Sequence, residues 1–152
     1  MNSTTFSQIL DENLHGLVLY ARQWADAKNQ SGCAEDVVQD ALVRLLRENP
    51  PPHSPKAWLY RVVRNLAIDH TRKAGRTVSL TETEQDWFES EADSLEITES
   101  LRKLDDEIRE IVVSKIWGNL TFREIAELTG RPISSIHYDY QQGLAQLKEL
   151  LE

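Results

Sequence analysis

The sequence predicts an all-α fold of two small helical domains joined by an acidic linker, with a helix-turn-helix in the C-terminal domain. Apolar residues recur at spacings of three and four along most of the chain, which is the period of an amphipathic helix. No alternating apolar and polar run of useful length occurs, so no sheet is expected. An acid-rich segment without periodicity divides the chain into expected ranges 1–76, 77–94 and 95–152.

Three helices are expected in the first domain. The first has an apolar stripe at Leu10, Leu14, Leu17, Val18 and Ala21. The second covers 34–48, with apolar residues Val37, Val38, Ala41, Leu42, Leu45 and Leu46. Prolines in 49–55 end it, because proline lacks a donor N–H and disfavours helix in the residue before it. The third covers 56–76, with an apolar side of Trp58, Leu59, Val62, Val63, Leu66 and Ala67.

The acidic segment 77–94 is rich in Ser, Thr, Asp and Glu, which predicts a mobile linker. Trp87 and Phe88 lie within it, and docking of these two rings onto a domain is left open. A new helical pattern begins near Leu95 and continues through Val112, and the stretch "GNL" at 118–120 interrupts it. Two further helices follow.

The length, composition and cysteine content of the chain exclude several protein classes. The 152 residues are 40% hydrophobic, which is enough for a packed interior in one or two small domains. The single Cys33 cannot form an internal disulfide, which fits a reducing compartment. The longest apolar run has about five residues against about 20 for a membrane span, and no secretory signal is recognisable. A soluble cytoplasmic protein without membrane insertion is therefore expected.

Residues with catalytic potential are sparse, so no enzyme, no cofactor, no metal and no small-molecule substrate are expected. The four histidines show no metal-ligand spacing, and the glycines form no phosphate loop. Asp36 and Asp40 share a helix face without a nearby His. Cys33 has no basic residue within four positions to lower its pKa.

The net charge of -8 is concentrated in one segment. Residues 1–76 have a balance of +2, residues 77–100 a balance of -8 and residues 101–152 a balance of -2. A low overall pI therefore does not exclude a local surface that binds nucleic acid.

The stretch 121–144 has the layout of a helix-turn-helix. Thr121 and Glu124 form a capping box, Gly130 suits a left-handed turn, and Pro132 fits the first turn of the second helix. An ordinary helical hairpin is the alternative. If the element binds DNA, the polar candidates are Arg131, Ser134, Ser135, His137, Tyr138, Gln141 and Gln142, with Asp139 alongside.

The third helix supplies the cations that this element lacks. One face has Arg61, Asn65, Asp69, Arg72 and Arg76, and Arg64, His70 and Lys73 flank it. A solvated charged face is the alternative to a nucleic-acid surface. Trp24, Trp58 and Tyr60 can stack on unpaired bases, but core packing is favoured for each of them.

Three blocks together resemble a known family: "AEDVVQDALVRLLRE", "AWLYRVVRNLAIDHTRK" and the stretch from "LRKLDDEIREIVV" through the helix-turn-helix. In order and spacing, from about residue 10, they resemble a bacterial RNA polymerase sigma factor of the extracytoplasmic-function type. The resemblance implies a sigma factor that binds core RNA polymerase and directs promoter recognition, DNA melting and transcription initiation.

The resemblance also implies roles for each part. Asp36, Gln39, Asp40 and Val43 would face the polymerase clamp. The loop 48–58 and the third helix would melt the minus-ten element, with Arg61, Arg64, Asn65, His70, Arg72, Lys73 and Arg76 on the non-template strand. The helix-turn-helix would bind the minus-thirty-five duplex, and the linker would run toward the RNA exit channel. Such factors are usually silenced by an anti-sigma factor, although no residue here indicates one.

One departure from the family falls on the second helix of the helix-turn-helix. Family members commonly have basic residues where this chain has His137, Asp139 and Gln142. This helix would therefore be delivered to DNA by polymerase and by the first domain. Two other hypotheses stay open: a stand-alone helix-turn-helix regulator, and a sigma-like decoy that binds polymerase without initiating.

Overall fold

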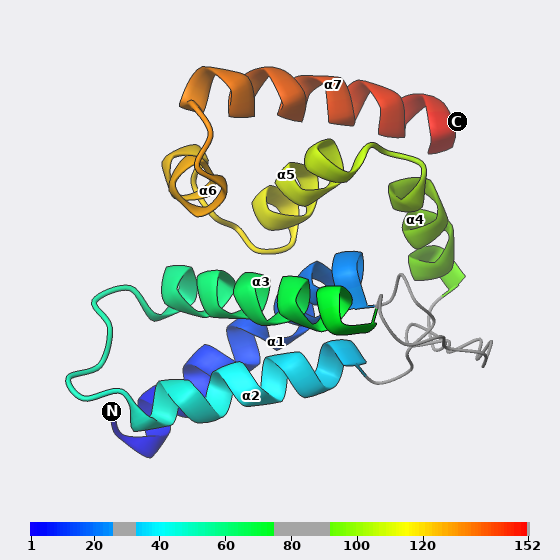
Figure 1. The fold of residues 1–152 in the computed structure, drawn as a ribbon. Helices are drawn as coiled ribbons and strands as arrows, with labels where there is room; N and C mark the ends of the chain where they lie inside the picture. The colour runs from blue at the N-terminus through cyan, green and yellow to red at the C-terminus, as the bar shows by residue number, and fades with distance from the viewer. Residues whose placement is uncertain (26–32, 75–91, 152) are drawn as a thin grey trace. The chain divides into compact units, whose positions relative to one another are not determined.

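The computed structural model describes residues 1–25, 33–74 and 92–151, with the backbone alone for residues 25, 71–74 and 92–95. Every element in these ranges is a helix (Figure 1). The chain divides into two compact units, Met1–Glu84 and Gln85–Glu152. The predicted all-α class is therefore confirmed. The linker residues 77–91, with Trp87 and Phe88, lie outside the described ranges. None of the described helices is both long and apolar enough to cross a membrane.

The first unit contains α1 (Ser3–Ala25), α2 (Cys33–Arg47) and α3 (Pro55–Ala74), and each helix packs against the other two. Its core is made of the side chains that the helical spacing predicts, including Leu17, Ala21, Val37, Val38, Ala41, Leu45, Leu59, Val63 and Ala67. Two predicted core residues differ: Leu14 is 42% exposed and Leu46 is 55% exposed. Both lie at the edge of an apolar stripe on their helix. The two neighbouring helices cover the middle of that stripe and leave its edge exposed.

Aromatic rings join α1 to α3 at the centre of this core. Tyr20 and Tyr60 are fully buried, and their ring centroids are 5.0 Å apart. Trp24 packs edge-on against Tyr20 at 5.1 Å. Burial raises the pKa of Tyr60 well above its ordinary value, because the phenolate would be poorly solvated there. Tyr60 is therefore a core residue and does not stack on bases.

An ion pair between a buried arginine and a partly exposed glutamate joins α1 to the first turn of α2. Arg22 is 7% exposed, and its Nη2 donates to Glu35 Oε2 at 2.6 Å. Removing the Glu35 carboxylate would be more costly than the net contribution of the pair suggests, because the Arg22 charge would stay buried. This contact ties the end of α1 to the start of α2.

The second unit contains α4 (Ala92–Arg102), α5 (Asp106–Ile116), α6 (Phe122–Thr129) and α7 (Ile133–Leu151). The sequence predicted one helical pattern from near Leu95 through Val112, and that prediction was wrong because the chain turns at residues 103–105. The predicted interruption at 118–120 is confirmed: α5 ends at Ile116 and Asn119 has a φ of 57°.

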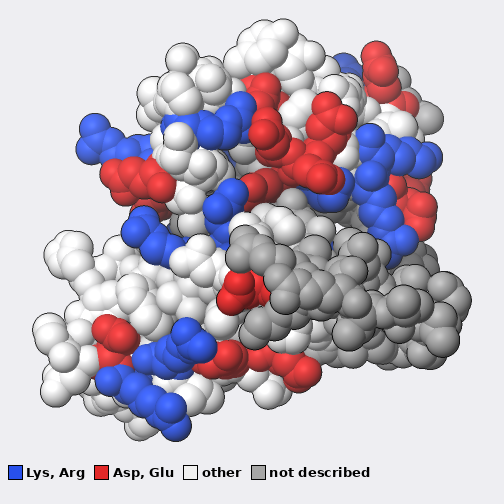
Figure 2. Space-filling view, in the orientation of Figure 1, with Lys and Arg blue, Asp and Glu red and all other residues white. Residues whose placement is uncertain are grey.

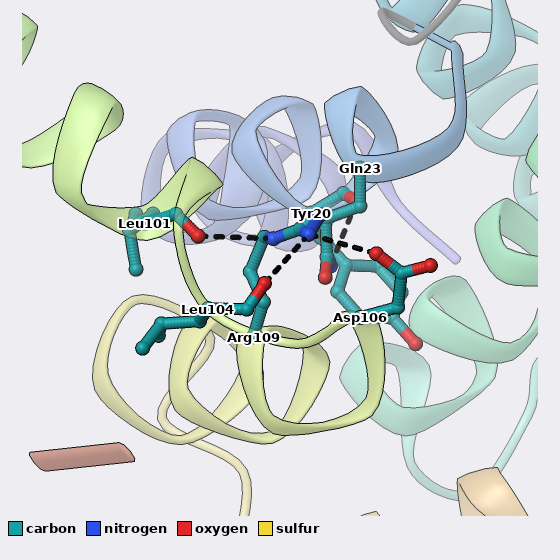
Figure 3. A network of polar contacts seen from close by, with 6 residues as sticks. All are labelled: Tyr20, Gln23, Leu101, Leu104, Asp106 and Arg109. Atoms are coloured by element: carbon teal, nitrogen blue, oxygen red, sulfur yellow. Dashed lines mark hydrogen bonds and ion pairs between the residues drawn. The ribbon is translucent and has the colours of Figure 1, made fainter. Parts of the chain in front are cut away.

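Arg109 stabilises the turn between α4 and α5 (Figure 3). Its Nε donates to the carbonyl of Leu101 at 3.1 Å, and its Nη2 donates to the carbonyl of Leu104 at 3.0 Å and to Asp106 at 2.8 Å. The last carbonyls of a helix have no partner within the helix, so a side-chain donor there stabilises its end. The side chain of Arg109 is 15% exposed, which keeps water from competing strongly.

Gly143 sets the distance between α7 and α5. A Cβ atom at this position would lie 2.6 Å from Val112 Cγ2 and 2.8 Å from Ile108 Cγ2. Both neighbours are β-branched helical residues with restricted χ1 rotamers, so they have little room to move aside. The close crossing therefore requires glycine, although glycine in a helix interior costs about 1 kcal/mol in propensity relative to alanine.

Candidate nucleic-acid interface

The helix-turn-helix forms through the local interactions that its residues predict. The Thr121 side chain accepts from the Glu124 N–H at 3.0 Å, and the Glu124 carboxylate accepts from the Thr121 N–H at 2.9 Å. Gly130 ends α6 with a φ of 73°, and its N–H donates to the Ala126 carbonyl at 2.9 Å. Pro132 directly precedes α7, one residue before the predicted position. The capping box and the glycine turn are confirmed.

The outer face of α7 is polar and carries no cation before Lys148. Ser134, His137, Tyr138, Gln141 and Gln142 are exposed, with Tyr138 at 65%, and Ser135 is partly buried. Opposite them, Ile136 and Leu147 are buried in the unit's core. The structure thus gathers the predicted residues on one accessible face of α7, where serine, glutamine and histidine side chains can hydrogen-bond to base edges.

Arg131, in the turn before α7, has carboxylate partners. Its Nη2 lies 2.5 Å from Asp139 Oδ2, and its Nη1 lies 3.9 Å from Glu107 Oε1 on α5. The side chains of Arg131 and Asp139 are only 25% and 19% exposed. Asp139 therefore faces the turn and forms an ion pair across it, a contact that the eight-residue separation did not reveal in the sequence.

An aromatic cluster places His137 at the junction of α6 and α7. Its ring lies 4.0 Å from that of Phe122, and Tyr140 contacts Phe122 edge-on at 5.3 Å. Lys115 Nζ, at the end of α5, lies 4.5 Å from the centroid of the Phe122 ring. Packing against Phe122 restricts the His137 side chain, which leaves less rotamer entropy to be lost on binding. Lys115 was not predicted to lie at this junction, although it lies three residues before Gly118, where the helical pattern stops.

The predicted nucleic-acid face of α3 is described in part. Arg61 and Asn65 are exposed, one turn apart. The Arg64 guanidinium lies 6.0 Å from the centroid of the Trp24 ring, within the range of a cation–π contact. The side chains of Arg72 and Lys73, and all of Arg76, lie outside the described part of the chain. The structure therefore shows Arg61 and Asn65 on an accessible helix face.

His70 contacts Cys33 across 37 residues of sequence. Cys33 Sγ and His70 Nδ1 are 2.9 Å apart, which links the start of α2 to α3. Burial raises the pKa of the Cys33 thiol, and the carboxylates of Asp36 and Glu35 raise it further. The thiol is therefore protonated at neutral pH, and it can donate to the His70 ring in the tautomer that leaves Nδ1 without a hydrogen. Sequence spacing gave no indication of this contact.

The predicted polymerase-binding residues share the outer face of α2. Asp36, Gln39 and Asp40 are exposed, and Val43 is 42% exposed. Asp40 accepts from Arg44 Nε at 3.0 Å in an exposed pair of the i,i+4 type. Leu46, one turn beyond Val43, adds a second exposed apolar side chain that the sequence assigned to the core. An acidic and apolar helix face is thus available to a protein partner.

Charges of both signs are interspersed on the face that Figure 2 draws, rather than forming one continuous basic patch. Among the described residues, no group of three His, Cys, Asp or Glu side chains is placed to hold a metal ion. The polar and charged faces described above are the candidate sites in this part of the chain.

Comparison with known families gives two matches, in order along the chain. Residues 9–77 match the family profile described as Sigma-70 region 2, and residues 94–147 match Sigma-70, region 4. The first match falls on the unit that contains α1–α3, and the second covers most of the unit that contains α4–α7.

Similar curated proteins are RNA polymerase sigma factors. The extracytoplasmic-function (ECF) sigma factor RpoE of Cereibacter sphaeroides is 24% identical over 131 residues, covering 81% of this chain and 72% of that protein. The ECF sigma factor SigW of Bacillus subtilis is 27% identical over 140 residues, covering 78% of this chain and 75% of that protein. SigV of the same organism is 24% identical over 129 residues, covering 80% of this chain and 77% of that protein.

Two solved structures share the fold. One is the sigma factor RpoE from Bartonella quintana in complex with the anti-sigma factor NepR, with a TM-score of 0.70, 24% identity and coverage of 97% of this chain and 96% of that one. The other is CnrH in complex with the cytosolic domain of CnrY, with a TM-score of 0.64 and 24% identity. The match covers 99% of this chain and 89% of that one.

Proposed function

Since the chain belongs to the sigma-70 family of RNA polymerase sigma factors and is of the extracytoplasmic-function type, we propose that its two units divide promoter recognition between them. As a sigma factor, it binds core RNA polymerase and directs transcription initiation at specific promoters. The observation that carries this conclusion is the pair of region 2 and region 4 matches, in order, one on each compact unit.

The outer face of α2 is the proposed contact with core polymerase. Asp36, Gln39 and Asp40 offer acids and an amide, and Val43 offers an exposed apolar side chain beside them. Protein interfaces of this kind combine an apolar centre with a polar rim. Leu46 extends the apolar part by one turn, and we include it in the proposed face.

The α3 face is the proposed contact with the melted minus-ten element. Arg61 and Asn65 are exposed there. Arg64, on the same helix, lies over the ring of Trp24 on α1. Arg72, Lys73 and Arg76 follow along the sequence and would extend the basic stretch. Exposed arginines bind phosphates of a single strand, and phosphate contacts supply most of the sequence-independent affinity. His70 is assigned a smaller role, because its ring is engaged by Cys33.

The outer face of α7 is the proposed contact with the minus-thirty-five duplex. Ser134, His137, Tyr138, Gln141 and Gln142 are accessible on it. Neutral polar side chains can distinguish bases but provide little attraction to phosphates. We therefore assign selectivity to this helix, and most of the affinity to polymerase and to the first unit.

An anti-sigma partner is also proposed. Two proteins of the same fold were solved in complexes: the sigma factor RpoE with the anti-sigma factor NepR, and CnrH with the cytosolic domain of CnrY. A comparable protein would silence this chain by covering its polymerase-binding surfaces. Action on polymerase places the proposed site of function in the cytoplasm.

Transcription from a pool of promoter fragments tests the proposed function. Purified core RNA polymerase is supplied with the full chain or with buffer, and RNA start sites are mapped. New start sites that depend on the chain, sharing sequence elements upstream, are expected. Binding to core without any specific start would favour a decoy, and absence of core binding would favour a stand-alone DNA-binding protein.

A further inference from the structure

The Arg131–Asp139 ion pair bridges the two parts of the helix-turn-helix. Arg131 follows the left-handed Gly130, and its backbone N–H donates to the Ala126 carbonyl at 3.2 Å, which fixes it against the end of α6. Asp139 lies on α7, nearly two turns from its start. Arg131 Nη2 and Asp139 Oδ2 are 2.5 Å apart, so the pair connects the turn to α7, the helix that would read the DNA.

Partial burial makes this pair less screened by water and salt than an ordinary surface ion pair. The two side chains are 25% and 19% exposed, whereas the pair between Arg44 and Asp40 has exposures of 53% and 47%. Solvent and salt screen charges less when they are partly removed from water. Glu107 holds the same guanidinium more weakly, because its carboxylate is 3.9 Å away and 76% exposed.

The pair changes the charge that α7 presents to DNA. Arg131 is the one Lys or Arg between Arg123 and Lys148, so it is the cation nearest in sequence to the start of α7, which would be the DNA-reading helix. Asp139 cancels its charge within the protein. A guanidinium already paired with a carboxylate releases no further counterion when DNA approaches, because a phosphate would have to displace Asp139 first.

We propose that Asp139 is a specificity-determining residue that acts by holding Arg131 away from the DNA backbone. The proposal rests on the proposed function in one respect, namely that the helix-turn-helix meets duplex DNA. In this chain the recognition helix then selects bases through neutral side chains such as Gln141 and Gln142, without a phosphate contact from the turn. Loss of Asp139 would release Arg131 to phosphates of any sequence and so reduce selectivity.

The salt dependence of DNA binding tests this coupling. The full chain is titrated onto a labelled random-sequence duplex of about 40 base pairs, with KCl from about 50 to about 200 mM, and log K is plotted against log salt. Four proteins form a cycle: the unaltered chain, Arg131→Gln, Asp139→Asn and the double variant. Each phosphate contact contributes about 0.9 to the slope, or a three- to fourfold change in affinity over this range.

Arg131→Gln is expected to leave the slope unchanged in the otherwise unaltered chain. Asp139→Asn is expected to steepen the slope by about one contact, and adding Arg131→Gln to it is expected to remove that gain. Asp139→Glu should keep the original slope, because it retains the carboxylate. Glu127→Gln is the matched control: Glu127 is an exposed acid on α6, and its removal should not make the slope depend on Arg131.

A slope that falls by about one contact with Arg131→Gln alone would overturn the proposal, since Arg131 would then already bind phosphate. An unchanged slope in Asp139→Asn would also overturn it. Thermal melting establishes that each variant is folded, and if Asp139→Asn unfolds, a lower slope for Arg131→Gln alone still overturns the proposal. Binding to core polymerase is measured separately, so that failure of the sigma-factor function is distinguishable from failure of this coupling.

Discussion

The two units differ in whether their polar contacts engage the arginines that were predicted to bind DNA: Arg131 of the second unit is engaged, and Arg61 of the first is exposed. Arg22 pairs with Glu35 and Cys33 contacts His70 across 37 residues. In the second unit, Thr121 and Glu124 cap α6, and Arg131 pairs with Asp139 eight residues away. These contacts engage Arg131 inside the helix-turn-helix, whereas Arg61 is exposed on α3. An arginine in the sequence of a DNA-binding element therefore need not present its charge to DNA.

The largest expected effect concerns the polymerase face of the first unit. Asp36→Arg with Asp40→Arg is expected to weaken binding to core polymerase by about a hundredfold or more, because like charges placed opposite each other cost several kcal/mol. Affinity for core polymerase is the measurement. Asp11→Arg with Glu12→Arg makes the same charge change on exposed residues of α1 and should have little effect. Equal loss in both variants would show that net charge, rather than α2, is responsible.

The next prediction concerns the cations of α3. Arg61→Ala with Arg72→Ala is expected to reduce open-complex formation by about tenfold, because removing a side chain that binds a phosphate or base of the single strand costs of order 1 kcal/mol. Binding to core polymerase should not change. Arg61→Lys with Arg72→Lys retains the charges and should recover most of the activity. Normal promoter opening by the alanine variant would remove α3 from the proposed interface.

A third prediction concerns packing in the second unit. Gly143→Ala is expected to lower the free energy of unfolding of this unit by about 1–2 kcal/mol, because overpacking against Val112 and Ile108 outweighs the gain in helix propensity. Chemical denaturation provides the measurement. Gln146→Ala, at an exposed position one turn along α7, should be neutral or slightly stabilising. A stabilised Gly143→Ala variant would mean that α5 and α7 can separate without cost.

The smallest expected effect is the pH dependence of the first unit. Burial raises the folded-state pKa of the Cys33 thiol, so the thiol ionises first in the unfolded chain as pH rises. Its contribution to stability is complete below the unfolded pKa of about 8.5 and declines as pH rises toward the folded value. The free energy of unfolding between pH 8 and pH 10 should therefore fall more steeply for the unaltered chain than for Cys33→Ala. Equal slopes would indicate that Cys33 is accessible to water.

Local chemistry explains which parts of this structure could be predicted. The capping box at Thr121, the left-handed Gly130 and the helical stripes depend on residues close in sequence, and the structure confirms them. The turn between α4 and α5 was missed because Arg109 stabilises it from the following helix.

Contacts between residues that are distant in sequence limit how much of the candidate site could be predicted. Spacing placed His70 and Arg131 on accessible faces, but their partners Cys33 and Asp139 are fixed by helix packing and by the geometry of the turn. Leu46 was assigned to the core because a stripe at helical spacing does not reveal how much of it two neighbouring helices can cover.

The most direct test of the contrast between the two units is the salt dependence of open-complex formation by polymerase carrying this chain, compared for Arg61→Gln and Arg131→Gln. Arg61→Gln is expected to lower the slope of log K against log salt by about one contact, while Arg131→Gln leaves it unchanged. The opposite result, with a lower slope for Arg131→Gln and an unchanged slope for Arg61→Gln, would contradict the division between an exposed Arg61 on α3 and an Arg131 that is paired inside the helix-turn-helix.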